Sequence, residues 1–162
     1  MIKKLHHNAY RCRDSEQTRE FYEDFLGLPL AHALRIENTA TGRAIRALHT
    51  FYQMDDRSYL AFFEVPGDPF DFKRHNDFDL HIALEVERPD LDAVLTRARA
   101  AGLEVRGIAD HDIVQSIYLR DPNGYVIELA APGPEHSAAP AASRSARDSL
   151  DSWQMAKKSA AL

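Results

Sequence analysis

Two histidines and two glutamates recur at matching places in this chain, and together they could hold a metal ion. The segment HNAYRCR at 7–13 is echoed by HIALEVE at 81–87, so that His81 corresponds to His7. Each copy ends near a glutamate that precedes a Pro-Gly pair, Glu64 in the first copy and Glu128 in the second. Two imidazoles and one carboxylate with open positions suit Fe(II) oxygen chemistry, whereas a fourth ligand suits an octahedral Ni, Zn or Co site that polarises a substrate oxygen. We therefore expect His7, His81 and Glu128 to bind a divalent metal, with Glu64 as the fourth ligand under the second chemistry.

Each copy predicts the same order of elements, a strand, a helix and three further strands. In the first copy the predicted strands are 5–13, 28–38, 43–54 and 58–65, and a helix capped by Asp14 or Ser15 ends at Gly27. In the second copy they are 80–86, 103–109, 114–120 and 125–130, and a helix starting near Pro89 ends at Gly102. Two such units fit a duplicated βαβββ module better than a solenoid, which needs at least three repeats to bury a continuous core.

The alternation of residue types along these strands assigns each side chain to a face of its sheet. In the second copy the apolar residues Leu80, Ile82 and Leu84 share one face, so His81 must point the other way. The same spacing places His7 on one face of the first strand and His6 on the opposite face. If the strands curl into a half-barrel, His7, His81 and Glu128 meet inside it. We expect the other histidines, among them His32, His49, His75 and His136, to lie on the surface or to line a pocket.

Composition limits the class of protein and its partners. With 162 residues the chain is long enough for one domain of ordinary size. The net charge is −5 and the two signs are interspersed, which argues against a nucleic-acid partner and for a small-molecule substrate. No run of 18 apolar residues and no N-terminal apolar core are present, so we expect a cytoplasmic protein without a membrane partner. The single cysteine, Cys12, lies in a predicted strand and is expected to be a small core residue.

The predicted domain covers residues 1–131, with modules at 3–66 and 78–131, and residues 132–162 are predicted to form a linker and a C-terminal helix. In this helix Ala146, Leu150, Trp153 and Ala156 recur at helical spacing. We expect a homodimer, because open sheets leave edges that need covering and this helix offers an apolar stripe.

The segments quoted above resemble the vicinal oxygen chelate superfamily, which includes glyoxalase I, bleomycin and fosfomycin resistance proteins, methylmalonyl-CoA epimerase and extradiol dioxygenases. The resemblance covers about residues 3–131 and rests on HHNAYRCRDSEQTREFYEDFLGLPL, LAFFEVP, DLHIALEVE and SIYLRDPNGYVIELAAP. It implies an α+β fold, in which two tandem βαβββ modules form a metal-binding half-barrel. The family's metal ligands fall on His7, His81 and Glu128, and Glu64 holds the position that glyoxalase I-like members use as a fourth ligand.

The second module also resembles the extradiol dioxygenase signature. The matching residues are His111, Ile117, Tyr118, Asp121, Pro122, Gly124 and Glu128. The chain departs from this pattern at Ala109, and at Arg57 and Ser58, where many ring-cleaving members carry another active-site histidine. The resemblance implies that His111 acts as an acid/base and that Tyr118 hydrogen-bonds a substrate oxygen, with Phe51, Phe62 and Phe63 as an apolar wall for a planar ring.

The leading hypothesis from the sequence is therefore a metal-dependent enzyme, an Fe(II) extradiol-type dioxygenase that cleaves a catecholic ring. One alternative is a glyoxalase I- or epimerase-like lyase or isomerase, in which Glu64 joins a Ni, Zn or Co site and also acts as a base; Mn is a further candidate metal. Another alternative is a metal-free drug-binding protein of the bleomycin-resistance type. The sequence alone leaves all three open, and also leaves open whether the modules pair within one chain or between two.

Overall fold

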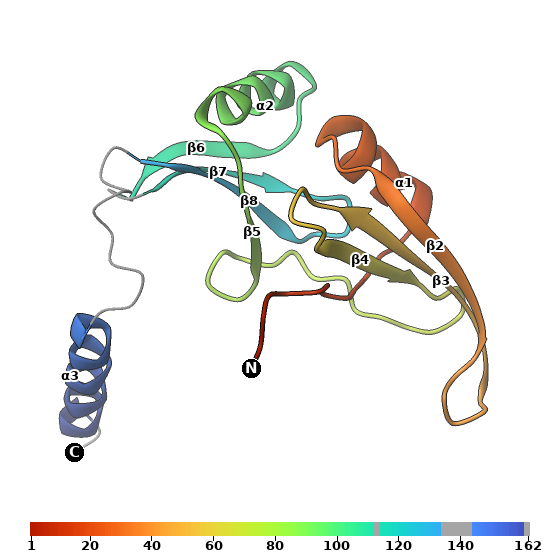
Figure 1. Cartoon of the computed structure of the whole chain (residues 1–162), viewed down its shortest axis with the longest axis horizontal. Helices are drawn as coiled ribbons and strands as arrows, with labels where there is room; N and C mark the ends of the chain where they lie inside the picture. Colours follow the sequence, from red (N-terminus) through yellow and green to blue (C-terminus); the bar gives the residue numbers. More distant parts are fainter. Residues whose placement is uncertain (112–113, 134–143, 161–162) are drawn as a thin grey trace.

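The computed structural model describes residues 1–111, 114–133 and 144–160 and has an α+β fold with two βαβββ modules and a C-terminal helix, as predicted (Figure 1). The first module contains β1 (Tyr10–Arg11), α1 (Ser15–Arg19), a π-helical continuation η1 (Glu20–Phe25), β2 (Leu30–Asn38), β3 (Ala44–Gln53) and β4 (Tyr59–Glu64). The second contains β5 (His81–Glu85), α2 (Arg88–Ala100), β6 (Val105–Asp110), β7 (Val114–Arg120) and β8 (Val126–Pro132). Helix α3 (Arg144–Ala160) follows.

Each module forms its own four-stranded sheet with the same strand order. The orders are β1-β4-β3-β2 and β5-β8-β7-β6, and the first strand of each module pairs in parallel with the last. The other neighbours are antiparallel because short turns connect them, whereas the first strand reaches the sheet through a helix. Both α1 and α2 lie on the same side of the sheets in Figure 1, which leaves the opposite faces open.

The helices form where the sequence predicts them, and each buries one face. The carboxylate of Asp14 accepts a hydrogen bond from the Gln17 N–H at 2.9 Å and so caps α1. Thr18 of α1 and Phe21 and Tyr22 of η1 are buried, and so is Cys12. Helix α2 begins with Arg88 and Pro89 and buries its stripe, which consists of Leu91, Val94, Leu95 and Ala98.

The two modules share one core and are held together by buried polar contacts. The Tyr22 hydroxyl donates to Asp121 Oδ2 at 3.0 Å, joining η1 to the turn between β7 and β8. From the same region, the Tyr125 hydroxyl donates to the Arg11 carbonyl at 2.9 Å, and Asn123 Oδ1 accepts from the Arg13 N–H at 2.8 Å. Tyr22, Asp121, Asn123 and Tyr125 are buried, so breaking these contacts would leave polar groups without partners, and the contacts hold the modules of one chain together.

The first strand is shorter than the sequence predicts, and this changes the position of His6. Only Tyr10–Arg11 belongs to the β1 ladder, preceded by an isolated bridge between His7 and Tyr59. Outside the ladder nothing imposes strand alternation, and the Nδ1 atoms of His6 and His7 lie 2.8 Å apart. The prediction that His6 points away from His7 is therefore wrong.

The C-terminal helix has the predicted spacing of apolar residues. Helix α3 lies apart from α1 and α2 in Figure 1, and its side chains from Ala146 to Ser159 are exposed. The linker expected before it, including His136, falls largely within residues 134–143, which are outside the described residues. In the described ranges, no helix is both long enough and apolar enough to cross a membrane.

Candidate metal site

The open face of the second sheet carries a row of polar side chains that the strand register brings together. Tyr118 on β7 is paired with Glu128 on β8, and Arg106 on β6 is paired with Tyr118. Ala83 on β5 completes the row opposite Glu128, two residues after His81. Directly paired residues project from the same face of a sheet, so Arg106, Tyr118 and Glu128 meet although they come from three strands.

His81 and Glu128 form the centre of this row. The Nδ1–H of His81 donates to the Asp77 carbonyl at 2.7 Å, because a carbonyl oxygen can only accept. In the neutral imidazole this leaves Nε2 without a proton, and Nε2 lies 3.3 Å from Glu128 Oε2. Two acceptors that face each other need a proton or a metal cation between them. A carbonyl partner on the far nitrogen is also the usual support of a metal-binding histidine, so both residues fit a metal site.

The other oxygen of Glu128 is held by Tyr118. The Tyr118 hydroxyl donates to Glu128 Oε1 at 3.2 Å, and His111 Nε2 lies 3.2 Å from the same hydroxyl oxygen. Burial, reinforced by the neighbouring Glu128 carboxylate, raises the pKa of Tyr118, so its hydroxyl stays protonated. Since that proton is used toward Glu128, His111 donates from Nε2 to the Tyr118 oxygen. The structure thus brings together His81, Glu128, Tyr118 and His111.

Asp77 and Arg106 complete this arrangement, and neither was selected as a site residue from the sequence. The Asp77 carbonyl orients His81, and its carboxylate pairs with the Arg106 guanidinium. The guanidinium of Arg106 lies over the Tyr118 ring, 4.6 Å from its centroid. Asp77 ends the segment that joins the two modules, and Arg106 occupies an exposed position on a β-strand. Neither residue belongs to a motif, so the only available signal was strand alternation on β6.

His7 lies on the first module, among aromatic side chains. Its ring is 5.5 Å from the Phe51 ring and 6.2 Å from the His49 ring. His49 stacks on Phe63 at 3.6 Å and donates its Nδ1–H to the Phe62 carbonyl at 3.0 Å. Burial lowers the pKa of His49, which is only 8% exposed. The expectation that His49 lies on the surface or lines a pocket therefore needs refinement, because it is a buried part of the aromatic face beside His7.

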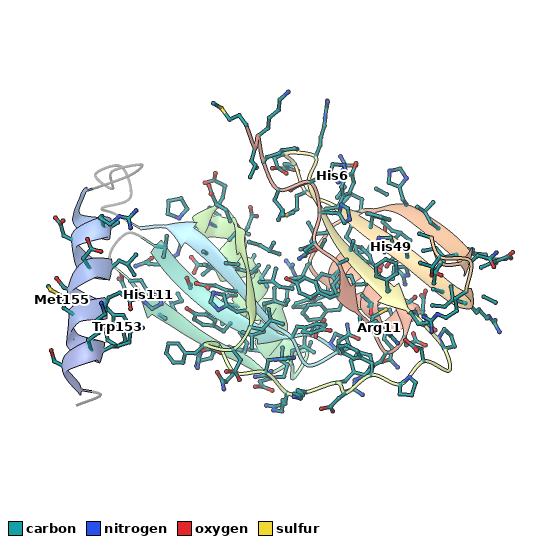
Figure 2. The ribbon with its side chains drawn as sticks, turned by 90° about the horizontal axis from the view of Figure 1, so that it is seen from below. His6, Arg11, His49, His111, Trp153 and Met155 are labelled. Carbon is teal, nitrogen blue, oxygen red and sulfur yellow. The ribbon has the colours of Figure 1, made fainter. Side chains whose placement is uncertain are left out.

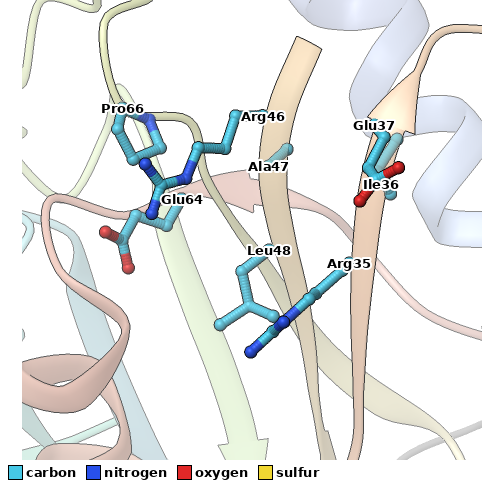
Figure 3. Close-up of a pocket in the computed structure, with 8 residues that line it drawn as sticks. All are labelled: Arg35, Ile36, Glu37, Arg46, Ala47, Leu48, Glu64 and Pro66. Atoms are coloured by element: carbon cyan, nitrogen blue, oxygen red, sulfur yellow. The ribbon is translucent and has the colours of Figure 1, made fainter.

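Glu64 does not occupy the position that matches Glu128. His7 is paired with Tyr59 and His81 with Val126, so the counterpart of Glu128, two residues farther along the last strand, is Ala61. The Glu64 carboxylate instead accepts a hydrogen bond from the Ser15 N–H at 2.7 Å, at the start of α1. Figure 3 shows it beside Arg46 and Pro66 at a cavity of about 410 Å³. The structure does not bring Glu64 into the row with His81 and Glu128.

The aromatic residues expected to form one wall are divided between the two faces of the first sheet. Phe62 is fully buried and its ring packs 4.7 Å from the Tyr22 ring on the helix side. Phe51 and Phe63 lie with His49 on the open face. The division follows from strand alternation, since Phe62 and Phe63 are consecutive.

The candidate metal ligands are thus distributed over both modules. In residues 1–111, 114–133 and 144–160, no three His, Cys, Asp or Glu side chains lie close enough together to hold a metal ion. His81 and Glu128 supply two adjacent donors, and His7 remains among the aromatic groups of the other module. Figure 2 shows His111 on the second sheet and His49 on the first.

Solved structures with the same fold support the assignment of the architecture. FosX, a fosfomycin resistance protein from Listeria monocytogenes complexed with Mn(II) and sulfate, has a TM-score of 0.60 and 21% identity, over 86% of this chain and 100% of that chain. A glyoxalase/dioxygenase from Nostoc punctiforme has a TM-score of 0.60 and 25% identity, over 80% of this chain and 91% of that one. A glyoxylase/bleomycin resistance protein/dioxygenase domain from Frankia has a TM-score of 0.65 and 17% identity, over 82% of this chain and 99% of that one.

No curated protein matches the chain. The family model described as the Glyoxalase/Bleomycin resistance protein/Dioxygenase superfamily matches residues 4–129, which include both modules and the His81–Glu128 pair. This chain therefore belongs to the Glyoxalase/Bleomycin resistance protein/Dioxygenase superfamily.

Proposed function

We propose that this protein is an Fe(II)-dependent, extradiol-type dioxygenase that cleaves the ring of a catecholic small molecule. The observation that carries the proposal is the pair formed by His81 Nε2 and Glu128 Oε2, which lie 3.3 Å apart. The other oxygen of Glu128 accepts a hydrogen bond from Tyr118, and Tyr118 is in turn hydrogen-bonded to His111. The pair supplies two of the three donors of a two-histidine, one-carboxylate site. His7 supplies the third.

In this proposal the third donor comes from a second copy of the chain. The buried contacts of Asp121, Asn123 and Tyr125 fix one module against the other, and His7 does not join the His81–Glu128 pair within the described chain. A second copy can place the partner subunit's His7 at this pair without disturbing those contacts. The site is then complete only in a homodimer, with two equivalent sites because the interface is symmetric.

Two further features favour ring cleavage over isomerisation. Glu64 is engaged by the Ser15 N–H, so three protein ligands remain and three octahedral positions stay open for a bidentate catecholate and O2. Phe51, Phe63 and His49 also give the open face of the first module an aromatic surface against which a planar ring can pack.

The roles of the remaining residues follow from their hydrogen bonds. Bound iron would supply the redox chemistry with O2, which no side chain here can provide. Tyr118 presents a protonated hydroxyl that can donate to a substrate oxygen. As Tyr118 gives its proton to the substrate oxygen, His111, which is exposed and hydrogen-bonded to the Tyr118 oxygen, is placed to replace that proton from solvent.

The test is reconstitution with Fe(II) without oxygen, followed by a panel of catechols and then oxygen, with the yellow ring-opened product as the readout. We expect His81→Ala and Glu128→Ala to lose iron. His111→Ala should keep iron and lose roughly 10²-fold or more in rate, the usual scale for a positioned acid/base. Glu85→Ala is the matched control, because Glu85 is an exposed carboxylate on the same strand as His81.

Two results would reject the dioxygenase proposal. One is the absence of product from every catechol with iron-loaded protein, together with turnover of methylglyoxal-glutathione by the nickel form, which would identify an isomerase. The other is the absence of bound Fe, Mn, Ni, Co and Zn at one equivalent per site, which would favour a metal-free binding protein. Manganese belongs in the panel because the structurally similar FosX was solved with Mn(II).

A further inference from the structure

A cleft between the two modules combines an apolar floor with an acidic rim. Its volume is about 770 Å³. The floor consists of Leu26, Leu28, Met54, Leu84, Val86, Val94 and Leu129. The rim carries five carboxylates, Asp55, Asp56, Glu85, Glu87 and Asp90, against one arginine, Arg97. Like charges gathered at the mouth of an apolar cleft favour an occupant that is both apolar and basic.

Most of the rim charge is not neutralised by neighbouring side chains. Asp56 pairs with Lys4, and Arg97 donates to the Phe25 carbonyl and lies over the Phe25 ring. Within the described parts of the chain, the side chains of Asp55, Glu85, Glu87 and Asp90 form no ion pair. Four carboxylates therefore remain available to an incoming cation.

Helix α3 has the matching properties. Leu150 and Trp153 are three residues apart on one face, and both are largely exposed, at 46% and 64%. Lys157 follows one turn after Trp153 on the same face, and the segment from Trp153 to Ser159 contains two lysines and no acid. Figure 2 shows Trp153 and Met155 on opposite sides of the helix.

We infer that α3 folds back and docks in the cleft of its own chain, with Leu150 and Trp153 on the apolar floor and Lys157 at the acidic rim. An amphipathic helix in an apolar groove is a common mode of recognition, and here the charges of helix and groove are complementary. Docking removes Trp153 from water and neutralises part of the rim. The cleft in which Leu150 and Trp153 would dock is distinct from the His81–Glu128 row.

The end of the second module, from which the chain continues to α3, lies near the cleft. Val86 and Leu129 line the cleft, and the Val86 N–H donates to the Ala130 carbonyl at 3.0 Å, two residues before β8 ends. The ten residues 134–143 separate the module from α3, and ten residues span up to about 35 Å when extended. The same helix can therefore reach the cleft without a second copy.

Trp153 is the only tryptophan, which makes its fluorescence a direct reporter. In the full chain at low salt we expect emission at shorter wavelength than that of an exposed indole and several-fold weaker quenching by acrylamide. Leu150→Ser should shift the emission to longer wavelength and restore quenching. Met155→Ser is the matched control on the opposite face and should change neither value.

Charge exchange tests whether the acidic rim is the docking site. The double variant Asp55→Lys/Glu85→Lys should release Trp153 from the cleft. The double variant Lys157→Glu/Lys158→Glu should do the same. A variant with all four changes should restore the docked emission. Asp55 and Glu85 are chosen because neither caps a helix, and far-UV circular dichroism confirms that each variant is folded.

Three outcomes would overturn the inference. The first is wild-type Trp153 that is quenched as strongly as in Leu150→Ser. The second is docked emission that is unaffected by reversal of the rim charges. The third is a shift that develops only with increasing protein concentration, because the helix would then occupy the cleft of a second copy.

Discussion

At the level of single residues, the two repeat-related glutamates have different surroundings. The two oxygens of Glu128 face Tyr118 and His81, and the residue is 8% exposed. Glu64 is bound to the Ser15 N–H, where a carboxylate stabilises the positive end of a helix. The first can take part in a metal site, while the second supports α1.

Replacing each glutamate with glutamine separates these roles. Glu64→Gln should keep the wild-type metal content and lower the free energy of unfolding by about 0.3–1 kcal/mol, the scale for a charge at a helix N-terminus. Glu128→Gln should lose most of the metal. Metal analysis and urea unfolding of both variants provide the measurements, and loss of metal from Glu64→Gln would place Glu64 on the metal after all.

At the level of the elements, a single buried carboxylate joins the first helix to the second module. Asp121 accepts from the Tyr22 hydroxyl, the Asn123 side-chain amide and the N–H groups of Asn123 and Tyr125. Burial raises the pKa of Asp121 above its ordinary value of 3.8, although these hydrogen bonds oppose the shift. The turn between β7 and β8 therefore acts as a structural joint between the modules.

Asp121→Asn should lower the free energy of unfolding by about 1–3 kcal/mol, because its amide would face two donors, the Tyr22 hydroxyl and the Asn123 amide.

The raised pKa of Asp121 also predicts that the stability of the protein depends on pH. The folded state holds the Asp121 proton more tightly than the unfolded state, so its contribution to stability is complete below pH 3.8 and declines as the pH rises through the folded-state pKa.

The measurement is denaturant unfolding of wild type and Asp121→Asn across that pH range. The advantage of the wild type over the variant should shrink with rising pH and then level off. An advantage that grows with pH would mean that the four hydrogen bonds outweigh burial and that the pKa is in fact lowered.

At the level of the whole molecule, the proposed metal site makes the oligomeric state part of the chemistry, because His7 lies apart from the His81–Glu128 pair within one chain. Buried contacts hold the two modules of one chain together. In a dimer with a two-fold axis, each chain can supply its His7 to the His81–Glu128 pair of the other chain. The edge strands β2 and β6 of the two sheets also need covering.

Mixing two inactive variants tests the shared site. His7→Ala and Glu128→Ala, each without metal, should recover about a quarter of the wild-type sites after subunit exchange, because half of the dimers are mixed and each has one intact site. Two His7→Ala preparations mixed together are the control. If the mixture stays empty while both variants remain dimeric, the ligands must come from one chain. An 18 kDa monomer in sedimentation at micromolar concentration would also exclude sharing.

The sequence by itself determined the features that depend on local periodicity. Strand alternation placed His81 on the face opposite Ile82, and helical spacing identified the apolar stripe of α3, because both patterns repeat within a few residues. The Asp14 cap and the buried Cys12 were predictable for the same reason.

Only the tertiary structure decided the features that depend on register and on contacts between distant segments. Sequence similarity between the copies matched Glu64 with Glu128, but the pairing of β1 with β4 makes Ala61 the counterpart, since a register is set by the whole ladder. Contacts across sheets and modules likewise placed Asp77 and Arg106 around the row of His81, Glu128 and Tyr118. They also set His7 apart from His81, because the docking of two modules depends on side chains far apart in sequence, which no local pattern encodes.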